Sequence, residues 1–361
     1  MTFIIATLII ILLVAIVIAL TYRHLSGEDL RKYDRPVTAF ATATQSEGLD
    51  QLNTYLDEQF GRPSVSGLSK DGWDAKRERF NAAGLARTDL QAEFRADHVY
   101  VDGHDITGSW TLVEGYDPNK RILYLHGGGF TVGSDISHRA LTTSLAKRTG
   151  AAVFALNYRL MPENPRMAGV EDARAAYDWI IENGPEGPDR LKTFAIAGDS
   201  AGGNLALMLS NWAKDTPRYK ADAVLAFSPS TDSTFSSPSL KANLSKDRVL
   251  KPLIAPLIKL PRLALLLLVR KLYKIVPSNP DISPIYADLS KLPPTLILAS
   301  TDETLYNDST RYVEKMKQEG SPVSFQAWAG GLPHVWPIFD NMIPEANAAL
   351  DEVGVFLNQY I

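Results

Sequence analysis

The chain has no cysteine among its 361 residues and no large excess of either charge. The missing thiols exclude disulfides, cysteine nucleophiles, iron–sulfur clusters and cysteine-based zinc sites. The 37 Lys and Arg residues nearly balance the 41 Asp and Glu residues, for a net charge of −4, which argues against a nucleic-acid-binding protein with a basic surface. With 45% hydrophobic and 22% charged residues, the composition is that of a globular protein rather than a disordered or fibrous one.

The first twenty residues also lack any charged side chain. Phe3 to Leu20 is a continuous apolar run in which Thr7 is the only polar residue, and as a helix it is long enough to cross a bilayer. A cleaved signal peptide would begin with basic residues and end in small ones, whereas this run has neither. We therefore predict an uncleaved transmembrane anchor over residues 1–22, with a signal peptide and a buried core helix as the alternatives.

Basic residues follow this apolar run, and only the terminal amine precedes it. They are Arg23, Arg31, Lys32 and Arg35. Because Lys and Arg are enriched on the cytoplasmic side of membrane spans, the sequence predicts that the rest of the chain faces the cytoplasm.

From about residue 96, short apolar runs alternate with longer amphipathic segments. The apolar runs are 122–125, 152–156, 194–197, 223–227 and 295–299, and the helical patterns between and after them are 137–149, 168–183, 202–214 and 306–319. Continuous apolar runs are typical of strands buried on both faces of a parallel sheet. The alternation predicts an α/β fold with a mostly parallel central sheet and helices on both faces, preceded by a polar, partly helical segment over residues 23–95.

One insertion departs from this alternation. Val249 to Val276 carries six basic residues and no acidic residue around the apolar core 263–269, and prolines at positions 252, 256 and 261 interrupt it, so we do not expect a second membrane span. Two interpretations stay open: an ordinary insertion that covers the core, and a cap that also rests on a membrane surface, as basic apolar helices do.

The sequence Gly198-Asp199-Ser200-Ala201-Gly202 follows an apolar run and opens a helical pattern. This is the G-x-S-x-G motif in its strand–turn–helix context. The turn is so tight that residues two positions either side of the serine must be small. We therefore predict Ser200 as a nucleophile exposed at the edge of the sheet, near a helix N-terminus that favours negative charge.

A glycine-rich loop, His126-Gly127-Gly128-Gly129-Phe130, ends the first parallel strand. Adjacent glycines let backbone N–H groups face a ligand, as an oxyanion hole requires. A phosphate-binding loop is the alternative, but no Gly-Lys-Ser/Thr follows. His126 itself is expected to hold this loop by hydrogen bonds rather than to transfer protons.

A serine nucleophile needs a base and an acid that orients the base. His334 is the only histidine after Ser200, and Asp302 lies three residues beyond the apolar run 295–299. The order Ser200, Asp302, His334 is the α/β-hydrolase order. We predict these three as the catalytic triad, with Asp308 as the second candidate for the acid.

Taken together, these motifs resemble the hormone-sensitive-lipase-like branch of the α/β hydrolases over about residues 40–360. The segments that carry the resemblance are 126–130 with Gly133-Ser134, 158–165 with Asp172, 198–204, Ser283-Pro284, 292–294, Asp302-Glu303 with Leu305 and Asp308, and 334–336. Within the branch, the Asp-Glu pair and the His-Val-Trp ending look most like bacterial esterases and ε-lactone hydrolases.

The resemblance implies an α/β-hydrolase core over residues 96–361 and oxyanion donors at Gly128, Gly129 and Ala201. It also implies that residues 23–95 and the insertion 233–280 form a cap over the site. The segment Arg166-Met167-Ala168-Gly169 departs from it, because relatives usually have Phe-Pro-Ala there.

The sequence therefore predicts a serine carboxylic ester hydrolase that acts on small hydrophobic esters through an acyl-enzyme. A lactonase, an amide deacetylase or a thioesterase with the same triad is an alternative, and so is a non-catalytic small-molecule-binding protein on the same fold. No metal, nucleotide or redox cofactor is expected. The expected partners are an ester or lactone substrate and a lipid bilayer, which residues 3–20 would cross. Residues 249–276 would touch the bilayer under the second of the two interpretations of the insertion.

Overall fold

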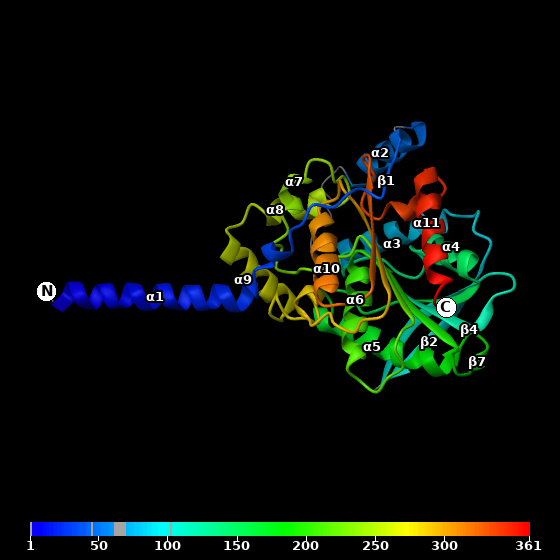
Figure 1. The fold of residues 1–361 in the computed structure, drawn as a ribbon, viewed down its shortest axis with the longest axis horizontal. Coiled ribbons are helices and arrows are strands. Elements are labelled where there is room, and N and C mark those ends of the chain that lie inside the picture. Colours follow the sequence, from blue (N-terminus) through cyan, green and yellow to red (C-terminus); the bar gives the residue numbers. More distant parts are fainter. Residues whose placement is uncertain (1, 45, 61–69, 102) are drawn as a thin grey trace.

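The molecule is built on one nine-stranded sheet (Figure 1). The computed structural model describes residues 2–44, 46–60, 70–101 and 103–361. The strands of the sheet are β1 (Ala41–Thr42), β2 (Glu93–Val101), β3 (His104–Leu112), β4 (Asp117–Leu125), β5 (Ala151–Leu156), β8 (Thr193–Asp199), β9 (Ala223–Phe227), β10 (Thr295–Ser300) and β11 (Val323–Ala329). Their order is β1-β11-β10-β9-β8-β4-β5-β3-β2, and only the β2–β3 and β3–β5 pairs are antiparallel. A separate small ladder joins β6 (Asn183–Gly184) to β7 (Gly187–Pro188).

Both faces of the central strands are buried, which explains their unbroken apolar sequences. In β4, Ile122 and Tyr124 pack into one core cluster, whereas Leu123 and Leu125 pack into the cluster on the opposite face. All four side chains are fully buried. The five strands expected from apolar runs are thus confirmed, and so is the α/β fold with a mostly parallel sheet.

Helices cover the two faces of the sheet. Helices α2 (Glu47–Phe60), α4 (Arg139–Thr149) and α11 (Pro344–Leu357) contribute to one core cluster, and α5 (Arg166–Glu182), α6 (Ala201–Lys214) and α10 (Tyr306–Gln318) to the other. The remaining helices are α1 (Thr2–Ser26), α3 (Lys70–Leu85), α7 (Ser239–Ala242), α8 (Lys251–Leu257) and α9 (Arg262–Tyr273), with short 3₁₀ turns η1 (Leu30–Tyr33), η2 (Pro284–Tyr286) and η3 (Trp336–Phe339). The four helical patterns read from the sequence correspond to α4, α5, α6 and α10.

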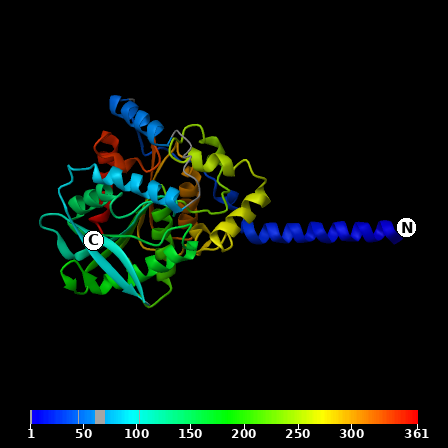
Figure 2. The same ribbon diagram turned by 180° about the vertical axis from the view of Figure 1, so that it is seen from behind.

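Helix α1 projects from the body as an isolated rod in two opposite views (Figures 1 and 2). Its apolar side chains are exposed as far as Leu20, at 62%, whereas Leu25 is buried. The segment Ile4–Tyr33 contains a window of mean hydropathy 3.3 with none of it buried. By length and composition α1 is a candidate for a membrane span or a signal segment. Helices α8 and α9 pass the same test only as a pair, and the chain bends by 120° between them.

The segment 23–95 is helical only in part. Its described residues form η1, α2 and α3, but also β1, which pairs in parallel with β11 at the edge of the sheet. The predicted cap segment includes residues 45 and 61–69, which lie outside the described residues. Arg311 on α10, itself buried, donates hydrogen bonds to both oxygens of Asp34, at 2.6 and 3.0 Å. This ion pair, in which Arg311 is buried and Asp34 is half-buried, fixes the chain just after η1 to the body of the protein.

The parallel strands β4, β8, β10 and β11 end at the same edge of the sheet. The loops that follow them carry, in the same order, the glycine loop, Ser200, the Asp302-Glu303 pair and His334. Ligands of open α/β sheets bind at this edge, so we expect the functional site to lie there.

Candidate active site

Ser200 occupies the sharp turn between β8 and α6. Its φ of 52° and ψ of −113° lie in a region that residues with side chains rarely adopt, at a cost on the order of 1–3 kcal/mol. A Cβ on Gly198 would overlap the carbonyl oxygen of Gly202, and a Cβ on Gly202 would overlap that of Leu125. The two glycines are thus required by the close approach of α6 to the end of β4, as expected from the motif.

The Ser200 hydroxyl and the His334 imidazole are in direct contact. His334 Nε2 lies 2.8 Å from Ser200 Oγ, and both residues are buried. On the other side of the ring, Nδ1 lies 3.0 Å from Oε2 of Glu303, whose side chain is fully buried. A carboxylate, an imidazole and a hydroxyl therefore form one continuous hydrogen-bonded chain.

The carboxylate that contacts the His334 imidazole belongs to Glu303. The prediction that Asp302 takes this position is wrong in the structure. The Asp302 carboxylate faces outward, where it accepts hydrogen bonds from Lys246 Nζ at 2.8 Å and from the backbone N–H of Gly331 at 2.9 Å. Asp302 thus braces the loop that leads to His334 instead of touching the imidazole.

The insertion holds the loop that carries Glu303. Asn243 donates hydrogen bonds to the carbonyl oxygens of Thr301 and Glu303, at 2.8 and 2.9 Å. The Asp247 carboxylate accepts two hydrogen bonds, each 2.7 Å, from the backbone N–H and the hydroxyl of Thr304. With the backbone fixed on both sides of position 303, Glu303 turns inward and its neighbour turns outward. The sequence pattern alone does not predict which of the two adjacent acids, Asp302 or Glu303, faces His334.

Asp308, the second candidate for the acid, lies on α10. It is buried, and its carboxylate accepts hydrogen bonds from the backbone N–H groups of Thr231 and Asp232. Burial raises the pKa of Asp308 to about 7, and the charge of Asp232 adds to the rise. Asp308 therefore anchors the start of the loop after β9, and among the described residues it forms no hydrogen bond with His334.

The buried pair changes the acidity of the base. Burial alone lowers the pKa of His334, but the hydrogen bond and the charge of Glu303 outweigh it, so the pKa lies above the ordinary 6.5. Burial raises the pKa of Glu303, and the His334 imidazole opposes that rise. The arrangement stabilises an imidazolium next to Ser200, as a general base in acyl transfer requires.

The glycine loop lies beside Ser200 and presents unused backbone donors. Gly128 and Gly129 have φ values of 114° and 60°, and a Cβ on Gly128 would overlap the carbonyl oxygen of Val132. Among the described residues, the N–H groups of Gly128, Gly129 and Ala201 make no backbone hydrogen bond outside helices and strands, and no side chain accepts from them. These donors are the three that the family resemblance implies for an oxyanion hole.

Asp199, which precedes the nucleophile in the G-x-S-x-G motif, fixes the glycine loop by hydrogen bonding. Its Oδ1 accepts hydrogen bonds from the N–H of Gly127 at 2.9 Å and the hydroxyl of Tyr124 at 2.6 Å. His126 contacts the carbonyl oxygen of Gly127 through Nδ1 at 2.7 Å, and burial lowers its pKa to about 3. His126 is thus neutral and holds the loop by hydrogen bonding, as expected. The supporting role of Asp199 could not be read from the motif, because its partners lie on another loop and strand.

Arg166, the departure noted in the sequence, lies behind the same loop. Its guanidinium carbon is 3.6 Å from the centre of the Phe130 ring, and Nη2 donates to Asn204 Oδ1 at 2.8 Å. Asn204 in turn donates to the carbonyl oxygens of Ser230 and Ile282. Burial lowers the pKa of Arg166 to about 10, so it remains a cation stacked on Phe130. The substitution changes the support of the loop and leaves Ser200, His334 and Glu303 untouched.

Comparison with known proteins identifies the family of the chain. Residues 122–338 match the family described as alpha/beta hydrolase fold, and the chain belongs to this family. An acetyl-hydrolase of Streptomyces hygroscopicus is 33% identical over 79% of this chain and 87% of its own length. An esterase of Acinetobacter venetianus is 34% identical over 65% of this chain and 73% of its own.

Solved structures similar to this chain are also esterases. The structure of EstE5 soaked with p-nitrophenyl butyrate superposes on this chain with a TM-score of 0.73 and 29% sequence identity, covering 88% of this chain and 99% of EstE5. An esterase from the bacterial hormone-sensitive lipase family has a TM-score of 0.72 and 28% identity, over 88% and 100% of the two chains. The protein is a hydrolase, and its relatives are esterases.

The two adjacent acids provide a matched test. Glu303→Gln removes the charge that stabilises the imidazolium, so we expect kcat/KM for a short p-nitrophenyl ester to fall roughly 100- to 10,000-fold. Asp302→Asn removes an equal charge one residue away and should retain activity within about fivefold, because only loop bracing is weakened. Thermal unfolding of both variants checks that they are folded, and the opposite ranking would restore Asp302 as the acid.

The pH profile gives an independent test. The base must be neutral to accept a proton, so kcat/KM should fall as the pH drops through the pKa of His334, at a midpoint above 6.5. In Glu303→Gln the stabilising charge is gone and burial still lowers the pKa, so the residual activity should show its midpoint at lower pH than the wild type. A midpoint that stays in place would separate Glu303 from the titration of the base.

Proposed function

We propose that the protein is a serine carboxylesterase in which Ser200 is the nucleophile, His334 the base and Glu303 the orienting acid. The observation that carries the proposal is the continuous contact from Glu303 through His334 to Ser200, with distances of 3.0 and 2.8 Å. The names of the esterase relatives support the same reaction class.

The reaction then follows from the positions of the groups. His334 Nε2 accepts the Ser200 proton as Oγ attacks the ester carbonyl carbon, and the Glu303 carboxylate stabilises the imidazolium that forms. The N–H groups of Gly128, Gly129 and Ala201 donate to the oxyanion, and losing one such donor typically costs about 3–4 kcal/mol of transition-state stabilisation. His334 returns the proton to the leaving alkoxide, and water then releases the acid from the acyl-enzyme by the same route.

The substrate class we propose is small esters with a hydrophobic acyl or alcohol group. Apolar side chains of α8 and α9 approach the glycine loop, where Leu253 Cδ2 lies 4.0 Å from the position that a Cβ on Gly129 would take. The ring of Tyr273 packs edge-on against Phe130, with centres 6.5 Å apart. These contacts support the expectation that the insertion forms part of a cap over the site.

We also propose that α1 anchors the protein in a membrane, with the insertion 249–276 beside the bilayer and the hydrolase body on the cytoplasmic side. The exposed apolar surface of α1 supports the anchor, and the basic residues after it support the orientation.

Replacement of the nucleophile tests the enzyme. Ser200→Ala should reduce hydrolysis of short p-nitrophenyl esters at least about 1,000-fold, because it removes the hydroxyl that is in contact with His334 and forms the acyl-enzyme. A fluorophosphonate should label the wild type and not this variant. A folded wild type that is neither labelled nor active would indicate the non-catalytic binding protein instead. If the wild type is active, a panel of lactones, amides and thioesters identifies which type of bond it cleaves.

The anchor is tested with the intact chain. We expect the expressed protein to remain in the membrane fraction after alkaline extraction, with an intact mass of 39.7 kDa. A smaller mass that lacks the apolar segment would show a cleaved signal peptide. Because the chain has no cysteine, Glu114→Cys on an exposed turn provides a single thiol, which an impermeant maleimide should fail to label in intact cells if the body is cytoplasmic.

A further inference from the structure

Most cations in and around helices α8 and α9 form no ion pair with the described residues. Between Val249 and Val276 there is no acidic residue, and five basic side chains in this segment form no ion pair with any other described residue. They are Lys251, Lys259, Arg270, Lys271 and Lys274. The sixth, Arg262, donates to the carbonyl oxygens of Thr234 and Phe235.

Several arginines elsewhere in the described part of the chain are paired with acids. Arg77 pairs with Glu163 and Arg87 with Asp340, and Arg159 pairs with the buried carboxylate of Asp172. The segment 249–276, by contrast, has no acidic residue of its own and holds five cations that form no ion pair with the described residues. Its charge is suited to an anionic partner.

Apolar side chains are exposed among these cations. Leu253, Leu267 and Leu272 have 54%, 46% and 53% of their surface exposed, and Leu260 has 38%. We call the five cations and four leucines together the α8–α9 face. Exposed leucines interleaved with unpaired Lys and Arg are typical of helices that lie in the interface of an anionic membrane.

The α8–α9 face lies where α1 leaves the body. Both views show α8 and α9 on the side of the molecule from which α1 projects (Figures 1 and 2), and α9 contacts α1. If α1 crosses a bilayer, this side of the body faces the lipid. The exposed leucines and cations are then at the depth of the headgroups.

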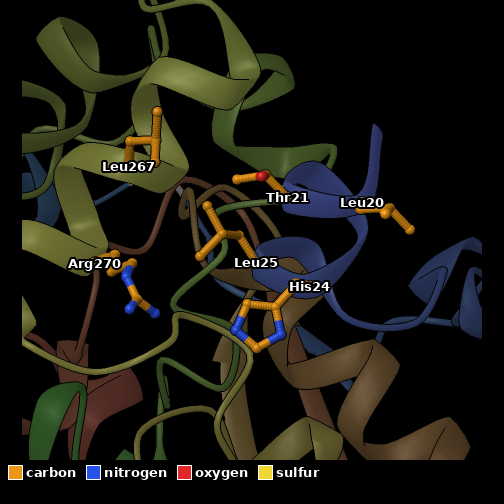
Figure 3. A pocket seen from close by; sticks show the side chains of 6 residues that line it. All are labelled: Leu20, Thr21, His24, Leu25, Leu267 and Arg270. Atoms are coloured by element: carbon orange, nitrogen blue, oxygen red, sulfur yellow. The ribbon is translucent and has the colours of Figure 1, made fainter. Parts of the chain in front are cut away.

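A pocket of about 380 Å³ lies between the end of α1 and α9, and both helices line it (Figure 3). Its lining is Leu20, Thr21, His24, Leu25, Leu267 and Arg270. The polar side chains of His24 and Arg270 come from the two different helices, next to the last exposed leucine of α1. A lipid phosphate in this pocket would meet a guanidinium, and its acyl chains would lie along Leu20 and Leu267.

We propose that the α8–α9 face and this pocket bind the headgroups of anionic phospholipids and hold the mouth of the catalytic site against the bilayer. The inference rests on the proposed esterase function. It narrows the substrate class to amphiphilic esters that partition into the membrane, because Leu253 of α8 approaches Gly129 of the glycine loop and Tyr273 at the end of α9 packs against Phe130.

The experiment uses the full chain in phosphatidylcholine vesicles with or without phosphatidylglycerol. Hydrolysis of p-nitrophenyl palmitate in the vesicles reports the lipid face, and hydrolysis of soluble p-nitrophenyl acetate reports the triad. One basic residue near an anionic surface contributes about fivefold to binding. We expect phosphatidylglycerol to raise palmitate hydrolysis about five- to twentyfold in the wild type, and Arg270→Gln with Lys271→Gln to abolish the increase.

A matched control removes two exposed cations elsewhere, by Lys147→Gln with Arg190→Gln. It should keep the increase, and all variants should hydrolyse the acetate like the wild type. Native mass spectrometry should find phosphatidylglycerol retained by the wild type and lost from Arg270→Gln, with inorganic phosphate unable to displace it. An equal increase in both double variants would overturn the lipid face, whereas loss of acetate hydrolysis from the wild type would overturn the esterase itself.

Discussion

The site depends on the close backbone contact between the start of α6 and the end of β4. Gly202 lies so close to Leu125 that no side chain fits at that position, and this contact places the serine turn against the loop that leaves β4. Ser200 and the donors of Gly128 and Gly129 come from positions about seventy residues apart, and this single backbone contact brings them together. Asp199 completes the junction, because its carboxylate accepts from Gly127 on the neighbouring loop.

A second junction positions the acid. The sheet brings the loops after β10 and β11 side by side, but it does not decide which carboxylate faces His334. That choice is made by Asn243 and Asp247, which lie in the insertion and bind the backbone on either side of Glu303. Part of the cap is therefore also part of the catalytic support.

The fold was predictable because its signals are local. Strands such as β4 and β8 are buried on both faces and read as unbroken apolar runs, and the glycines around Ser200 report a turn that only one geometry allows. His334 was identified because no other histidine follows the serine. The acid was not, because Asp302 and Glu303 are adjacent and their directions are set by contacts with residues about sixty positions earlier. The edge strand β1 has two residues, too few for any pattern, and the support given by Asp199 depends on a partner in another loop.

The insertion divides into two parts with separate duties. Its root, around Asn243 and Asp247, binds the loop of the acid, whereas its tip, residues 251–274, carries the exposed leucines and the cations that form no ion pair with the described residues. Changes in the tip leave the hydrogen bonds of Asn243 and Asp247 to the loop of Glu303 intact, whereas changes in the root would release that loop. The border between the part of the insertion that supports the acid and the part that faces the surroundings thus lies within a few residues of Asp247.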